Sequence, residues 1–310
     1  MAIRRGLTMF WKGWPAPMAD VSIRFAIPDE RLRPYLSTYW EMEVSGAGVV
    51  DDMLHPEWAN IRMALDTPWG FAPSFDTLGP LEDRCIIHGP TSKPTFVRGY
   101  AGRAFGIGIL PPGWNRFWKA DASTFANRFP PLSELMGEES VTFEQKLLSA
   151  PGFDARIEVA NALMLAILGR SRKSRFDDQV AAFFQVLTDP ASATVEQITS
   201  TLGLPQSRLG RLSKRGFGFP PKLLLSRQRF LRMLGTLHAR PYEEWSDFLD
   251  PQYVDQSHMI RDFQRFLGMA PSHYFALKRP ILMAATKGRA ALFGQPLQGL
   301  HLPQTTALKA

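Results

Sequence analysis

The sequence predicts an α+β protein with a β-rich N-terminal half and an all-α C-terminal half. Between residues 21 and 118, short runs of aromatic and β-branched residues alternate with frequent Gly and Pro, as in strands joined by turns. Residues 176–280 instead carry apolar residues at helical spacing. The length of 310 residues is enough for about two domains of ordinary size.

The basic charge is concentrated in the second half. Residues 1–169 have 16 Lys and Arg against 19 Asp and Glu, whereas residues 170–290 have 19 against 10. This split indicates either a C-terminal half that meets a polyanion or a solvated basic surface. The single cysteine, Cys85, fits a cytoplasmic protein without disulfides. We expect neither a signal peptide nor contact with a membrane, because the longest apolar stretch is too short to span one.

The β-rich half is expected to begin after a flexible N-terminus at residues 1–18, which has no periodic pattern. Residues 19–150 then predict a barrel or sandwich of the cupin-like kind. Near the end of this region, residues 121–136 have an apolar stripe typical of a helix.

A linking helix and a basic hinge are expected at residues 151–175. The apolar face of residues 154–169 could pack on the chain's own barrel or against a second subunit, and the pattern alone leaves both options open. The polar, basic run at 170–175 is the best candidate for a domain boundary.

Residues 195–212 fit a helix-turn-helix. Val195, Ile198 and Leu202 share one side of a first helix, and Gly203 can supply the positive φ of the turn. Leu209 and Leu212 would bury a second helix, leaving its polar and basic side chains outside. A DNA-recognition helix needs this division of faces.

The same pattern recurs fifty residues later. Matches of residue type pair Gln206 with Gln256, Ser207 with Ser257, Arg211 with Arg261, Arg215 with Arg265, Gly218 with Gly268 and Pro221 with Pro271. Such a repeat predicts a duplicated small module rather than one isolated hairpin.

Two segments of the repeat region carry a family resemblance. VEQITSTLGLPQSRLGRLSKRGFGFPPKLLLSRQRF and the later YVDQSHMIRDFQRFLGMAPSHYF resemble the double helix-turn-helix domain of AraC/XylS-type bacterial transcription regulators. The resemblance covers residues 176–280 and implies an all-α DNA-binding domain there, with a C-terminal tail at residues 281–310. In the N-terminal half, HPEW at 55–58, GPTS at 89–92 and GIGILPPGW at 106–114 are similar to a barrel-type sensor domain of the same regulators.

The resemblance also implies which residues contact DNA. In the two recognition helices, these are Ser207, Arg208, Arg211, Lys214, Arg215, Gln256, Ser257, His258, Arg261 and Arg265. The resemblance places the base-reading positions at Ser207, Gly210, Arg211, Gln256, Ser257, His258, Ile260 and Arg261. Arg211 is expected to be the main reader of the first unit, helped by Ser207 and Arg208, because arginine can pair with a guanine edge. Lys214, Arg215 and Arg265 suit phosphates. Gly210 occupies a reading position but has no side chain.

The second unit departs from the family in its first helix, which should run from about Trp245. Pro251 falls inside that helix, Gln252 replaces the turn glycine, and Phe248 replaces a small packing residue. We therefore expect a shortened first helix and a second recognition helix that docks poorly.

Other candidate sites are weak. His55, Glu57 and His88 lack the closely spaced His-x-His pair of metal-binding cupins, so we predict no metal, no cofactor and no catalytic residue. A set of aromatics could line an effector pocket or form core: Tyr35, Tyr39, Trp40, Trp58, Trp69, Phe96 and Trp114.

The resulting prediction is a sequence-specific transcription regulator that is not an enzyme. Its expected partners are double-stranded promoter DNA and RNA polymerase, while a small-molecule effector and a homodimer are left open. Two alternatives are a small-molecule enzyme built on the barrel and a degenerate family member that binds protein instead of DNA.

Overall fold

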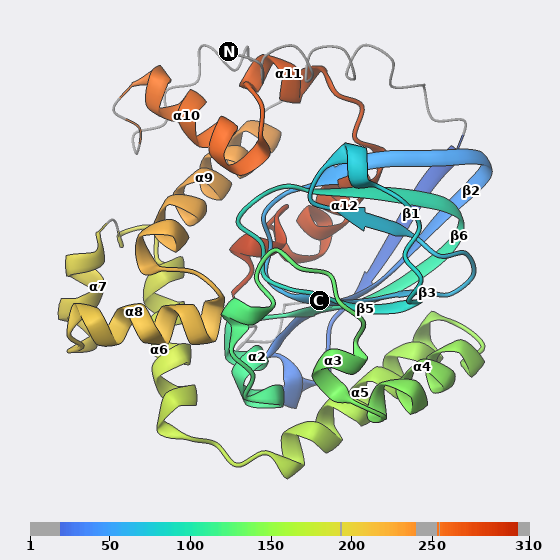
Figure 1. The fold of residues 1–310 in the computed structure, drawn as a ribbon, viewed down its shortest axis with the longest axis horizontal. Helices are drawn as coiled ribbons and strands as arrows, with labels where there is room; N and C mark the ends of the chain where they lie inside the picture. Colours follow the sequence, from blue (N-terminus) through green and yellow to red (C-terminus); the bar gives the residue numbers. More distant parts are fainter. Residues whose placement is uncertain (1–18, 193, 240–252, 254, 303–310) are drawn as a thin grey trace.

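The computed structural model describes an antiparallel sheet followed by a helical region, which confirms the predicted α+β class (Figure 1). The described residues are 19–192, 194–239, 253 and 255–302. Among them no helix is both long and apolar enough to cross a membrane.

The sheet has six strands. They are β1 (Ala19–Ala26), β2 (Leu36–Leu54), β3 (Asn60–Ala64), β4 (Gly70–Ala72), β5 (Cys85–His88) and β6 (Thr95–Ile109). The order is β1-β2-β6-β3-β5, with β4 paired to β6, and every pairing is antiparallel. The long strands β2 and β6 curve, so the sheet wraps like part of a barrel around one concave side (Figure 1).

The strands are longer than the sequence predicts. Several glycines that the sequence pattern assigns to turns lie within strands in the structure. The register of β2 against β6 shifts between Val44 and Val49, where Gly46 and Gly48 have φ of +92° and +150°. Opposite them, Gly102 of β6 has φ of +134°. These are left-handed conformations that glycine adopts without strain, and bulges of this kind increase the local bend of a strand.

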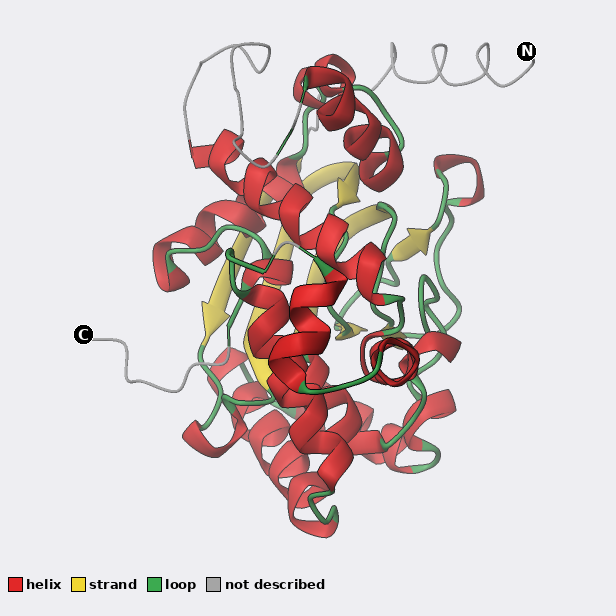
Figure 2. Ribbon diagram, turned by 90° about the vertical axis from the view of Figure 1, so that its left-hand side faces the viewer, coloured by secondary structure: helices red, strands yellow, loops and turns green. Residues whose placement is uncertain are grey.

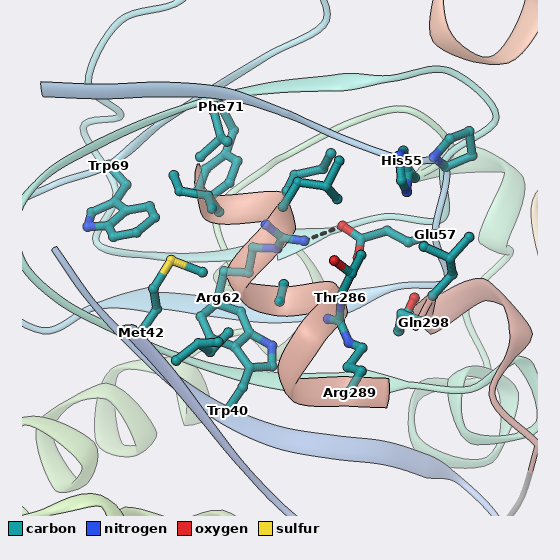
Figure 3. A pocket seen from close by; sticks show the side chains of 18 residues that line it. Trp40, Met42, His55, Glu57, Arg62, Trp69, Phe71, Thr286, Arg289 and Gln298 are labelled. Atoms are coloured by element: carbon teal, nitrogen blue, oxygen red, sulfur yellow. Dashed lines mark hydrogen bonds and ion pairs between the residues drawn. The ribbon is translucent and has the colours of Figure 1, made fainter. Parts of the chain in front are cut away.

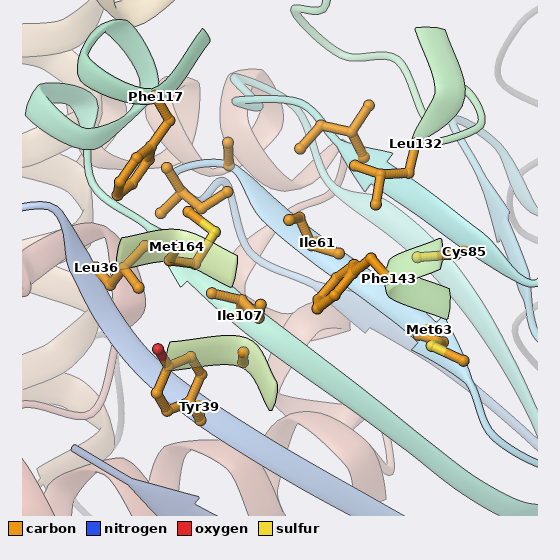
Figure 4. Packing of buried hydrophobic residues seen from close by; sticks show 14 of the residues in the cluster. Leu36, Tyr39, Ile61, Met63, Cys85, Ile107, Phe117, Leu132, Phe143 and Met164 are labelled. Carbon is orange, nitrogen blue, oxygen red and sulfur yellow. The ribbon is translucent and has the colours of Figure 1, made fainter. Parts of the chain in front are cut away.

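Helices α4 (Glu139–Ser149) and α5 (Phe153–Arg170) cover one face of the sheet. The apolar cluster of Figure 4 lies between these helices and the sheet. Ala160 and Met164 of α5 are completely buried against this cluster. Arg156 of α5 also reaches a buried carboxylate, with its Nη1 2.7 Å from Glu41 Oε2 on β2. The apolar face of this helix therefore packs on the chain's own sheet.

The opposite face is covered by α12 (Pro280–Phe293), which lies on the concave side of the sheet (Figure 1). Ile281 joins the cluster formed by Trp40, Met42 and Trp69. The carboxylate of Asp52 on β2 accepts a 2.8 Å hydrogen bond from the backbone N–H of Leu282. The residues that we expected to form a C-terminal tail thus include a helix that completes the sheet domain.

The expected helix at residues 121–136 is wrong over most of its length. This segment has only a 3-10 turn at Ala122–Thr124 and one helical turn, α3 (Ser133–Met136). Pro130 and Pro131 lie between them and cannot donate backbone hydrogen bonds to a helix.

The helical half packs beside the sheet domain (Figure 2). Its helices are α6 (Arg175–Thr188), α7 (Val195–Leu202), α8 (Gln206–Phe217), α9 (Pro221–Ala239), α10 (Gln256–Leu267) and α11 (Pro271–Ala276). A further helix, α2 (Pro111–Trp118), belongs to the N-terminal half and contacts α6 and α8.

Candidate nucleic-acid interface

Helices α7 and α8 form the predicted first helix-turn-helix. Thr194 and Gln197 make a reciprocal capping box at the start of α7, which supplies acceptors to backbone N–H groups that a helix start leaves unpaired. Gly203 ends α7 with φ of +60°, and α8 begins three residues later. Leu209 and Leu212 of α8 are buried.

The opposite side of α8 faces solvent. Ser207, Arg208, Arg211, Lys214 and Arg215 are all exposed there. The guanidinium of Arg215 lies 4.7 Å from the ring centre of Phe176 on α6, so this side chain also has a contact within the protein. The residues of α8 that the sequence assigned to DNA contact therefore share one exposed side of the helix, and their contact with DNA stays a prediction.

Helix α10 carries the second group of residues that the sequence predicts to contact DNA. The carboxylate of Asp255 caps it by accepting a 2.6 Å hydrogen bond from His258 N–H. Met259 and Phe263 are buried on one side, whereas Gln256, Ser257, Arg261 and Arg265 are exposed on the other.

His258 differs from the other predicted contact residues, because its ring faces the protein. His258 Nε2 lies 3.0 Å from Arg229 Nη2 on α9, and Arg229 also pairs with Asp262 of α10 at 2.8 Å. Tyr253 donates its hydroxyl to the same carboxylate at 3.0 Å. Sequence reasoning missed this cluster, because no local pattern links Arg229 to residues some thirty positions later.

Helix α10 is packed against α9, although the sequence leads to the expectation that it docks poorly. Trp245, Phe248, Pro251 and Gln252, which motivated that expectation, lie outside the described residues. Helix α10 itself is twelve residues long and capped, and its apolar face is buried against Phe230 and Leu234 of α9. Poor docking of this helix is therefore not observed.

A groove of about 680 Å³ lies between the first helix-turn-helix and α9. Polar and basic side chains line it, among them Thr194, Gln206, Lys222, Ser226, Arg229 and Arg232. The last four follow one side of α9, so the helix that joins the two units also carries positive charge along the groove.

The loops that hold HPEW and GPTS contact the helical half. The Trp58 ring packs against Phe184 of α6 and Phe217 of α8, with ring centres 5.7 and 6.0 Å apart. The guanidinium of Arg227 on α9 lies 3.8 Å from the Trp58 ring centre and donates a 2.8 Å hydrogen bond to the Thr91 carbonyl. Burial lowers the pKa of Arg227 to about 9. These sequence motifs therefore mark an interface between the two halves.

A second contact between the halves is made by His55. Its Nε2 lies 2.6 Å from the Tyr274 hydroxyl of α11, and that hydroxyl is 2.7 Å from His238 Nε2 of α9. Burial lowers the pKa of His238 to about 4 and that of His55 well below its ordinary value. His55 thus has a structural role, and within the described ranges no group of three or more His, Cys, Asp and Glu side chains could hold a metal ion.

The aromatic residues proposed for an effector pocket have separate locations. Trp40 and Trp69 line a cavity of about 40 Å³ between the sheet and α12, shown in Figure 3. Tyr39 and Trp114 belong to the core on the other face, and Trp58 lies at the interface with the helices. Arg62, Thr286, Arg289 and Gln298 line the cavity with the two tryptophans.

No family model matches the chain, and no curated protein matches it. A solved structure of a variant of ToxT from Vibrio cholerae has a TM-score of 0.40 and 10% identity, covering 86% of this chain and 100% of that chain. Another ToxT structure has a TM-score of 0.38 and 9% identity, covering 83% and 98%. The AraC-like transcriptional activator CuxR has a TM-score of 0.27 and 13% identity, covering 68% and 86%. Similarities of this size carry no argument about what this chain binds.

Proposed function

We propose that this chain is a transcription regulator of the AraC/XylS type that binds double-stranded DNA through α8 and α10. The observation that carries the proposal is that both helices have a buried apolar side and an exposed basic side. Each of these helices has twelve residues, buries an apolar side, exposes arginines on the other, and ends at a left-handed glycine. A basic face supported by a buried one is what a recognition helix needs to enter a major groove.

The helix between the two units supports the same proposal. Helix α9 has nineteen residues, which corresponds to a length of about 28 Å at 1.5 Å per residue. Successive major grooves on one face of DNA are about 34 Å apart, so two elements held at the ends of such a rod suit neighbouring grooves. In this arrangement the basic groove along α9 faces the intervening phosphates.

The proposed roles follow from side-chain chemistry. Arg211 and Arg261 read base edges, because a guanidinium can donate two hydrogen bonds to guanine. Ser207, Gln256 and Ser257 assist them at the first turn of each helix. Arg208 helps Arg211, whereas Lys214, Arg215 and Arg265 neutralise phosphates, and such contacts make affinity fall steeply with salt. His258 contributes indirectly, because its ring holds Arg229 beside α10.

The sheet domain acts in this proposal as the regulatory half. Its loops contact α6, α8, α9 and α11 through Trp58 and His55, so a change in the sheet domain would alter how the recognition helices are presented. RNA polymerase stays a predicted partner, and a small-molecule effector and a second copy of the chain stay open possibilities. The enzyme and protein-binding alternatives have no contact in the described residues that favours them over DNA binding.

A DNA-binding titration of the full chain tests the proposal. Fluorescence anisotropy would follow a labelled duplex from the DNA that flanks its own gene, at several salt concentrations. We expect retention that falls steeply with salt, and a loss of about 1–3 kcal/mol of binding free energy for Arg211→Ala and for Arg261→Ala. Lys146→Ala on α4 removes an exposed charge from the far side of the sheet and serves as the control. A DNA affinity that changes neither with salt nor in the two arginine variants would refute DNA binding through these helices.

A further inference from the structure

The cavity between the sheet and α12 contains nitrogen donors without acceptors. Arg62 enters it from β3 and Arg289 from α12, as Figure 3 shows. Within the described residues, the Nε atoms of both arginines are buried and have no hydrogen-bond partner. The indole Nε1 atoms of Trp40 and Trp69, which also line the cavity, are likewise buried without a partner among the described residues. Buried donors are nearly always paired in folded proteins, so two unpaired guanidinium nitrogens at one cavity point to an acceptor there.

The charges around the cavity are also unbalanced. Arg62 forms an ion pair with Glu57, the one carboxylate among the described residues that line the cavity. Among the described residues, Arg289 has no ion-pair or hydrogen-bond partner, and its guanidinium is 5.1 Å from the ring centre of Phe25. Only 9% of Arg289 is exposed. Glu57 also acts electrostatically on Arg289, so one carboxylate serves two buried guanidinium groups and one positive charge remains in excess.

The size of the cavity limits what could supply that charge. With α12 in place, about 40 Å³ is open, which is enough for a few water molecules or one small anion but not for a longer organic molecule. Water could accept hydrogen bonds from the arginine donors, but it would leave the excess charge uncompensated. A small anion satisfies both requirements.

We propose that one small anion, between chloride and formate in size, binds between Arg62 and Arg289 and joins α12 to the sheet. Without it, two guanidinium groups from different elements face a common cavity and repel each other. With it, each cation has a shared partner, and the helix is held more firmly on the concave side. The anion is therefore expected to stabilise the folded chain by ordinary linkage.

The position of α12 connects this site to the proposed DNA-binding unit. Helix α12 follows α11 after only three residues, and one of them, Arg279, places its guanidinium 3.8 Å from the Tyr274 ring centre of α11. Fixing α12 would thus fix one end of the second helix-turn-helix. This regulatory consequence rests on the proposed function, whereas the binding of the anion does not.

The experiment measures the thermal unfolding of the full chain without DNA. Sodium gluconate, whose anion is too large for the cavity, sets a constant ionic strength and is replaced stepwise by chloride or formate. We expect Tm to rise with the logarithm of the anion concentration once that concentration exceeds the dissociation constant, as binding at one site requires. General effects of salts on protein surfaces would instead change Tm in proportion to the salt concentration.

Two variants on the same helix identify the site. Arg289→Gln should raise the apparent dissociation constant of the anion, fitted from the Tm titration, by about ten-fold or more, since charged hydrogen bonds are the strong ones. Lys287→Gln removes an exposed charge from α12 and should change it by less than about two-fold. A Tm of the wild-type chain that does not respond to exchange of gluconate would overturn the proposal, even if Arg289→Gln does not fold. An equal effect of both variants would also overturn it. Neither result would alter the outcome of the DNA titration, so the two proposals can fail separately.

Discussion

Trp40 lies across the neighbouring strand β6 at a place where that strand has no side chain. A Cβ atom at Gly106 would be 2.1 Å from two carbons of the Trp40 ring, and one at Gly108 would be 2.1 Å from Ser37 Oγ. Both glycines therefore allow close packing. In the sequence, a glycine needed for close packing cannot be distinguished from a glycine in a turn.

Two glycine substitutions should have opposite effects on stability. Gly106→Ala should lower the free energy of unfolding by about 1–3 kcal/mol, because the new methyl group overlaps a buried ring. Gly210→Ala should raise it by about 0.5–1 kcal/mol, because nothing lies within 4 Å of a Cβ in the middle of α8. Urea unfolding of both variants checks this prediction. A loss of stability in Gly210→Ala would contradict the assignment of α8 as a regular helix with an open face.

The sequence could predict part of the candidate site and not the rest. Arg211 and Lys214 are identifiable because Leu209 and Leu212 fix the buried side of the same helix, and periodicity within one element reveals this. His258 could not be assigned correctly from its own helix, because its ring is directed by Arg229 on another element. Arg289 could not be recognised at all, since its environment is formed by strands more than two hundred residues earlier.

At the scale of elements, helix α12 and the helix-turn-helix differ in how far sequence predicts them. Helices α7 and α8 carry local signals, namely the capping box at Thr194 and the turn at Gly203. Helix α12 has a buried stripe that includes Thr286 and Arg289 together with apolar residues, so no apolar period is visible. Its burial depends on the sheet, and tertiary packing of that kind overrides a local pattern.

Two neighbouring substitutions on α12 test its packing on the sheet. Ile281 is 1% exposed in the cluster with Trp40 and Trp69, so Ile281→Ala should cost about 2–5 kcal/mol of unfolding free energy. Met283 is 47% exposed on the same helix, and Met283→Ala should change stability by less than about 0.5 kcal/mol. Denaturant titrations would show the difference as a shift in midpoint. Equal midpoints for the two variants would mean that α12 does not pack on the sheet as described.

At the scale of the whole molecule, buried histidines determine how stability depends on pH. Burial lowers the pKa of His238 to about 4 and of His301 to about 3, and it lowers the pKa of His55 and His88 well below the ordinary 6.5. Each of these histidines is neutral when folded and binds a proton when unfolded, so stability is lost as pH falls below 6.5. Asp52 acts in the opposite direction, because burial raises its pKa to about 7 and its contribution is lost as pH rises from 3.8 through 7.

We expect the four histidines to outweigh the one aspartate. Between pH 7.5 and 5.5, the net loss should be roughly 3 kcal/mol of unfolding free energy, given about 1.4 kcal/mol per group and pH unit. His301→Gln should reduce this loss by about 1 kcal/mol. His273→Gln, at an exposed position on α11, is the matched control. Urea unfolding at both pH values would test the sign, and a chain more stable at pH 5.5 would disprove it.

Because α12 completes a domain whose strands end at Ile109, that domain is assembled from two distant parts of the chain. During synthesis, about 170 residues must be added after β6 before α12 exists, which takes on the order of 10–30 s at usual rates of translation. Until then, the concave side around Trp40, Trp69 and Phe71 is exposed on the ribosome. The nascent sheet is therefore the part of this protein on which a chaperone has the longest time to act.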